Sequence, residues 1–74
     1  LLDKSIDIST LEKISDAINE NNAIINDIHV WKIASSHQAA ILAISSNEPL
    51  NPEQYKIILK KFLPNLSHIS IEIN

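Results

Sequence analysis

Residues 51–74 read NPEQYKIILKKFLPNLSHISIEIN, and this stretch decides the fold because it passes from a helical to a strand pattern. Asn51 and Pro52 are typical of a helix start, since Asn caps free N–H groups and Pro suits the first helical position. The apolar residues that follow form one helical stripe: Tyr55, Ile58, Leu59, Phe62 and Leu63. Pro64 prevents the helix from continuing. Residues 67–74 then alternate strictly between polar and apolar, which predicts a strand with one buried face.

Before this pair, residues 24–34 and 38–46 predict a β-hairpin. Both stretches are rich in aliphatic residues, and a polar break at residues 35–37 separates them. Gly is absent from the break, so the sequence leaves the type of turn open.

The first helix is predicted to begin at Ser9. Ser9 is the expected N-cap, and Glu12 three residues later completes a capping box. The apolar residues that recur at helical spacing are Leu11, Ile14, Ala17 and Ile18. Asn21 and Asn22 end this helix, because Asn tolerates the left-handed conformation that helix ends often adopt.

The order helix, strand, strand, helix, strand predicts an α+β fold. We expect a ferredoxin-like or metallochaperone-like α-β-β-α-β sandwich, with two helices on one face of a three-stranded mixed sheet. Residues 1–8 are a lead-in, and residues 9–74 form the domain. The uncovered face of the sheet is expected to carry His29 and Trp31 or their neighbours, together with His68, Ser70 and Glu72.

The composition narrows the class of protein. The 74 residues contain no Gly, Cys or Met, and nine acidic against six basic residues give a formal net charge of −3. Without Cys there is no disulfide or thiolate ligand, and without Gly there is no glycine-rich phosphate loop. The acidic balance argues against nucleic acid as a partner. The apolar run at residues 39–44 is too short to cross a bilayer, so a soluble piece is expected. The missing Met predicts a fragment or a processed chain.

Catalysis is the weakest functional interpretation. Ser35, Ser36 and His37 offer a nucleophile and a base, but neighbouring residues of an extended chain point in opposite directions. A polar turn explains them better, and no other Ser, His and Asp set has a recognisable spacing. We therefore expect a protein that is not an enzyme.

Metal binding is the stronger alternative. Asp27 and His29 share one face of the first strand, and His68 and Glu72 share a face of the last. Imidazole and carboxylate groups suit Zn²⁺, Co²⁺ or Ni²⁺. A strand lies between the two pairs, so convergence needs long reach or a second subunit.

Two apolar residues have open roles. Trp31, the only Trp, fits equally a strand core and an interface, where Trp is over-represented among energetically important residues. Ile57 lies beside the stripe of the second helix. It either widens that stripe or makes a small partner contact, and we expect the first.

Three segments together resemble a known family. Leu1-Leu2-Asp3, then Asn26-Asp27-Ile28-His29-Val30-Trp31-Lys32-Ile33, then His68-Ile69-Ser70-Ile71-Glu72-Ile73 resemble the cytoplasmic C-terminal domain of cation diffusion facilitator (cation efflux) transporters. The resemblance covers essentially the whole chain. Its most specific part is Asp27 to Trp31, where the family reads Asp-Leu-His, an aliphatic residue and Trp. The nearest branch is the one that exports cobalt, nickel and zinc.

The resemblance implies a domain of a membrane antiporter that exchanges a divalent metal ion for protons. It implies a cytoplasmic homodimer attached to a transmembrane domain, with Leu1 just past the last membrane helix. It also implies a regulatory metal site near the dimer interface, with Trp31 and His29 at that interface.

This sequence departs from the family at two ligand positions. Asn26 and Ala43 stand where many members have His. The resemblance therefore implies a site that is weak, absent, or rebuilt from His29, His68 and Glu72. The alternative from a different class is a free-standing ferredoxin-like module that binds a small ligand or acts as an adaptor.

Overall fold

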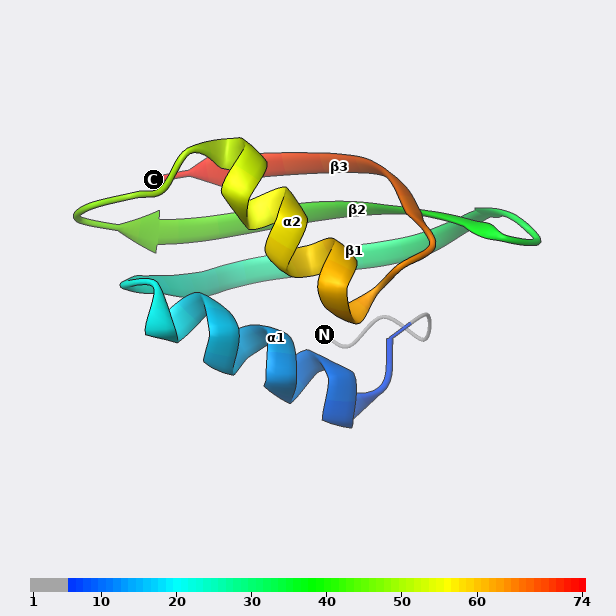
Figure 1. Cartoon of the computed structure of the whole chain (residues 1–74), viewed down its shortest axis with the longest axis horizontal. Helices are drawn as coiled ribbons and strands as arrows, with labels where there is room; N and C mark the ends of the chain where they lie inside the picture. Colours follow the sequence, from blue (N-terminus) through cyan, green and yellow to red (C-terminus); the bar gives the residue numbers. More distant parts are fainter. Residues whose placement is uncertain (1–5) are drawn as a thin grey trace.

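Two helices and three strands make up residues 6–74, the part of the chain that the computed structural model describes. Helix α1 (Ile8–Glu20) precedes strands β1 (Ala23–Ala34) and β2 (His37–Ser46), and helix α2 (Pro52–Phe62) precedes strand β3 (Leu66–Ile73) (Figure 1). The predicted α-β-β-α-β order is confirmed. The Leu1-Leu2-Asp3 part of the predicted lead-in lies outside the described residues.

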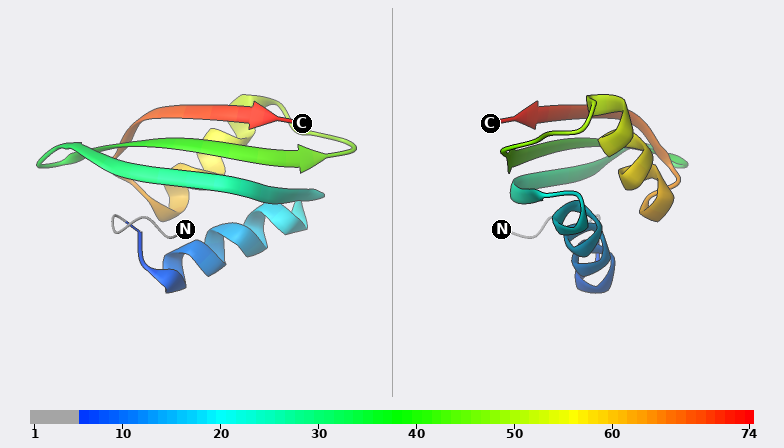
Figure 2. Two further views of the ribbon diagram at one scale, coloured as in Figure 1. Left: turned by 180° about the vertical axis from the view of Figure 1, so that it is seen from behind. Right: turned by 60° about the vertical axis from the view of Figure 1, so that its left-hand side comes forward.

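The sheet has the order β1-β2-β3, with β2 in the centre. β1 pairs with β2 antiparallel, and β2 pairs with β3 parallel. A parallel pair needs a crossover connection, and α2 provides it. Both helices lie on the same side of the sheet, and the opposite side is bare (Figure 2). The predicted two-layer arrangement on a mixed three-stranded sheet is therefore confirmed.

The core lies between the helices and the sheet. Its largest fully buried side chains come from both helices and from the sheet: Ile14 and Ile18 of α1, Tyr55 and Leu59 of α2, and Val30, Leu42 and Ile44 of the strands. The Tyr55 hydroxyl accepts a hydrogen bond from the Leu50 N–H at 3.0 Å, so the one polar atom on this buried ring has a partner. Among the described residues, no charged or polar residue is buried.

The predicted cap of α1 is wrong. Asp7 is the N-cap, and its side chain accepts a hydrogen bond from the Thr10 N–H at 2.7 Å, while Ser9 lies inside the helix. This bond lowers the pKa of the Asp7 carboxyl, because it stabilises the charged form. Helix α1 thus begins at Ile8, within the segment predicted as lead-in.

The predicted end of α1 is confirmed. Asn21 is the C-cap, and Asn22 has φ of 62°, the left-handed conformation in which Asn replaces the usual Gly. Ser46 Oγ donates a hydrogen bond to the Asn22 carbonyl at 2.7 Å, which ties this turn to the end of β2.

Helix α2 begins as predicted and differs from prediction at one residue. Asn51 is the N-cap and forms a capping box with Gln54. Ile57, expected to widen the apolar stripe, is 69% exposed. Ile57 therefore lies outside the buried side of this helix, which Tyr55 and Leu59 occupy.

Candidate functional site

The side of the sheet that the helices leave bare is called the open face below. The register places the open-face residues in three cross-strand rows: Trp31-Ala39-His68, His29-Ile41-Ser70 and Asp27-Ala43-Glu72. Side chains in one row point the same way because residues opposite each other share a face. The prediction that His68, Ser70 and Glu72 lie on the uncovered face is confirmed, and of the two sets of β1 residues left open by the sequence, the one with His29 and Trp31 lies there.

Asp27 and His29 form a polar pair at the outer edge of this face. His29 Nε2 lies 2.9 Å from Asp27 Oδ2, and both side chains are more than half exposed. An exposed pair of this kind contributes little to stability. Both groups therefore remain accessible to a ligand or a partner.

The donors predicted for a metal are divided between the two edges of the sheet. His29 lies on β1, whereas His68 and Glu72 lie on β3, with β2 between them. Two strand spacings separate these edges by about 10 Å. Within residues 6–74, no three His, Asp or Glu side chains converge into a set that could hold a metal ion. A site built from His29, His68 and Glu72 would need donors from a second copy of the chain.

A bulge in β1 alters the neighbourhood of Asp27. The pairing with β2 shifts between Ile25 and Asp27, and Asn26 is the extra residue. Its Nδ2 donates a hydrogen bond to Ser45 Oγ at 2.7 Å. Asn26 and Ala43 therefore adjoin Asp27 and Glu72 on the open face, although neither supplies an imidazole. The alternation of side chains in the sequence does not reveal this bulge.

Trp31 lies on the open face rather than in the core. Its side chain is 42% exposed. It borders a hollow of about 350 Å³ whose lining includes Ala39, Ile41, His68 and Ser70. Ile24, 64% exposed, lies on the same face of β1. Asp27 and His29 lie between Ile24 and Trp31 on this face, so the apolar surface beside Trp31 comes from Ala39 and Ile41.

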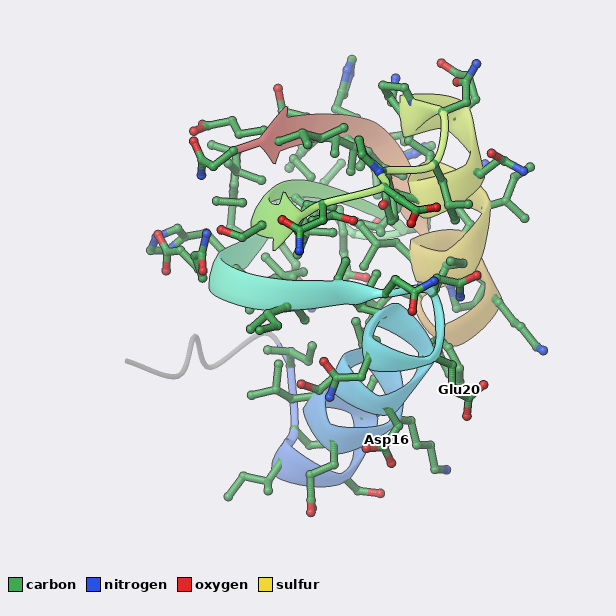
Figure 3. The ribbon with its side chains drawn as sticks, turned by 90° about the vertical axis from the view of Figure 1, so that its left-hand side faces the viewer. Asp16 and Glu20 are labelled. Carbon is green, nitrogen blue, oxygen red and sulfur yellow. The ribbon has the colours of Figure 1, made fainter. Side chains whose placement is uncertain are left out.

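Other polar groups lie elsewhere. Ser35 and Ser36 form the exposed turn of the hairpin, and His37 begins β2, as the turn interpretation predicts. Asp16 and Glu20 extend from α1 in the helix layer (Figure 3). Their carboxylates therefore add no ligand to the open face.

The fold is that of a small ferredoxin-like α+β domain, as predicted. Two solved structures share it: the cadmium form of an Asp-to-Glu variant of the MamM C-terminal domain, and a His-to-Ala variant of the same domain. The first superposes with a TM-score of 0.64 at 8% identity, covering 90% of this chain and 94% of that chain. The second superposes with a TM-score of 0.63 at 8% identity, covering 89% and 92%.

Comparisons of the amino-acid sequence with protein families and with curated proteins found no match. Among the described residues, no helix has the length and apolar character needed to span a membrane.

Proposed function

We propose that this chain is the cytoplasmic regulatory and dimerisation domain of a cation diffusion facilitator, a membrane antiporter that exports Zn²⁺, Co²⁺ or Ni²⁺ in exchange for protons. The observation that carries the proposal is the fold likeness to the C-terminal domain of MamM, a member of that family, along nearly the whole of both chains. The Asp27-Ile28-His29-Val30-Trp31 motif supports it, because its polar and aromatic side chains lie together on the open face.

The open face is the proposed dimer interface. Trp31 and Ile24 expose apolar surface there, and an aromatic side chain beside a hollow is a typical energetic centre of an interface. A chain of this size has a small core, so burying one face against a second copy also stabilises the fold. His29 lies one row from Trp31 and would be covered with it.

The proposed metal site spans two copies. One chain offers Asp27 with His29 at one edge and His68 with Glu72 at the other, and a second copy would bring missing donors to either pair. Carboxylate and imidazole groups suit Zn²⁺, Co²⁺ and Ni²⁺. Because Asn26 and Ala43 supply no imidazole, we expect weak binding. A divalent ion shared by two chains would tighten the dimer.

Sedimentation over a range of protein concentrations tests the dimer. Wild type should change from monomer to dimer, and Trp31→Ala should weaken association by about 2 kcal/mol, roughly 30-fold. Ile57→Ala is the matched control, because Ile57 is also an exposed apolar side chain but lies on α2, away from the open face. A wild type that stays monomeric, or an equal effect of both variants, would contradict the proposal.

Calorimetric titration with ZnCl₂ tests the metal site separately. His29→Ala and His68→Ala should each reduce the heat of binding. A two-fold dimer that joins the His29 edge of one chain to the His68 edge of the other repeats the site, so we expect two ions per two chains. His37→Ala is the control, because the third His lies at the hairpin turn. Heats that are the same in wild type and His29→Ala would remove His29 from the site.

A further inference from the structure

The two free edges of the sheet differ in regularity. Along β1 the register shifts twice, between Ile25 and Asp27 and between Lys32 and Ala34. Bulges of this kind protect an edge from pairing with another strand. Along β3 the register shifts once, between Leu66 and His68, and the pairing with β2 then runs without interruption from His68 to Ile73. β3 carries fewer shifts than β1, and its regular part borders α2, so β3 is the more regular edge for a further strand.

The main chain of β3 presents a row of free groups. Asn74, just past its end, uses both main-chain groups on β2: its N–H donates to the Ile44 carbonyl at 2.8 Å, and its carbonyl accepts from the Ser46 N–H at 3.4 Å. In a parallel strand the residues alternate in the side to which their N–H and C=O point. The main-chain groups of Ile69, Ile71 and Ile73 therefore point to the free edge.

A groove lies between this edge strand and α2. It has a volume of about 270 Å³. Its lining consists of Glu53, Lys56, Ile57 and Lys60 of α2 with Leu66, Ser67 and Ile69 of β3. Figure 1 shows α2 crossing the sheet obliquely, with the connection to β3 at one end of the space between them. The 69% exposure of Ile57 gives the helical wall an apolar side chain that packs against nothing in the core.

The charge on the helical wall favours an acidic ligand. Lys56 Nζ contacts Glu53 Oε1 at 3.3 Å, which neutralises that pair. Lys60 makes no ion pair within residues 6–74, so its ammonium remains available. An edge strand beside a helix that supplies apolar and charged side chains matches the general scheme by which a sheet binds an extended peptide.

We propose that the groove between α2 and β3 binds an extended segment of another protein, which adds to β3 as a fourth strand. The main chain of the segment pairs with the free groups of Ile69, Ile71 and Ile73. Alternate side chains of the segment point toward α2, where an apolar side chain packs on Ile57 and a carboxylate meets Lys60. This binding does not depend on the open face and goes beyond the proposed function.

An NMR titration of the whole chain with a blocked peptide, Thr-Val-Thr-Glu-Thr-Val-Thr, tests the proposal. Its Val and Glu side chains share one face of a strand, and its Thr side chains share the other. Amide shifts should concentrate at residues 67–73 and 56–60. Exchange of the Ile69 and Ile71 amide hydrogens should slow at saturation. The same peptide with N-methyl groups on alternate residues should not bind, because it cannot pair with the edge.

Charge reversal separates a specific contact from net charge. Lys60→Glu should raise the Kd at least about tenfold, since it replaces a charge-assisted bond by a like-charge contact. Lys13→Glu, which makes the same change on α1, should leave the Kd unaltered. Peptide shifts along β1, no peptide shifts, or binding of the N-methylated peptide would each overturn the proposal. So would Lys60-dependent binding to phosphatidylserine vesicles without peptide binding, or amide protection of β3 that grows with protein concentration alone.

Discussion

At the scale of single residues, Asn22 shows how a chain without Gly makes its tightest turn. It is the one residue among 6–74 with a positive φ, and it joins the end of α1 to β1. This conformation raises the free energy of most L-residues by about 1–2 kcal/mol, and that of Asn by less. The turn therefore depends on the identity of one side chain.

The effect of a substitution at Asn22 on the free energy of unfolding should depend on the backbone conformation that the new residue tolerates, rather than on its side-chain contacts. Asn22→Ala should lower the free energy of unfolding by about 1 kcal/mol, because Ala tolerates positive φ poorly. Asn22→Gly should leave it nearly unchanged. Urea denaturation measures both values. Equal values for the two variants would show that the left-handed conformation does not limit stability.

Ala43 is the residue whose replacement should most improve metal binding. It stands between Asp27 and Glu72 in one cross-strand row, so an imidazole there would adjoin two carboxylates. Ala43→His should therefore raise the affinity for Zn²⁺ at least about tenfold, or about 1.4 kcal/mol. Titration calorimetry measures it, with Ala43→Gln as the control of similar size. An equal affinity in both variants would show that the row does not bring its donors together.

At the scale of elements, the cap of α1 makes part of the stability depend on pH. The hydrogen bond from the Thr10 N–H lowers the pKa of Asp7 below its ordinary value of 3.8. A depressed folded-state pKa contributes stability that is complete above the unfolded pKa and is lost as pH falls through the folded value.

Acid should therefore weaken α1 through Asp7. The melting temperature of wild type should fall below about pH 4, and Asp7→Asn should reduce that fall because an amide caps without titrating. Thermal unfolding followed by circular dichroism between about pH 2 and pH 7 checks this. Asp16→Asn on the same helix is the control, and an equal change in both acid profiles would contradict the assignment to the cap.

The sequence predicts the elements better than their ends and irregularities. The apolar stripe of α2 and the alternation in β3 follow from which side chains a core can bury, so both appear in the pattern. The cap at Asp7 does not stand out from Ser9, because each carries an oxygen that could satisfy the first turn. The bulge at Asn26 depends on pairing with β2, which residues 23–34 alone do not determine.

The candidate site likewise has features that the sequence pattern predicts and features that depend on how the strands pair. Alternation correctly assigns His68, Ser70 and Glu72 to one face, whereas both alternate sets of residues 24–34 are mixed and leave the face of His29 and Trp31 open. The rows that place Ala43 between Asp27 and Glu72 require the register of two different pairings, one antiparallel and one parallel. The groove beside β3 depends on where α2 crosses the sheet, and the sequence pattern carries no signal for that crossing.

At the scale of the whole molecule, a proposed dimer should couple association to stability. If the folded chains associate and unfolded chains do not, mass action raises the melting temperature as protein concentration rises. Scanning calorimetry over a hundredfold range of concentration should show this for wild type. Trp31→Ala should show a much smaller rise. A wild-type melting temperature that is independent of concentration would contradict dimerisation through folded chains.

The placement of the two largest aromatic rings gives the molecule separate optical reporters. The single Trp lies on the open face, whereas the single Tyr is fully buried between helix and sheet. Excitation at the red edge of the absorption band selects the indole, so its emission wavelength and quenching report what covers that face. The phenol signal in near-ultraviolet circular dichroism reports the packed interior. Covering of the bare surface and melting of the core can therefore be followed in one cuvette, without an attached dye.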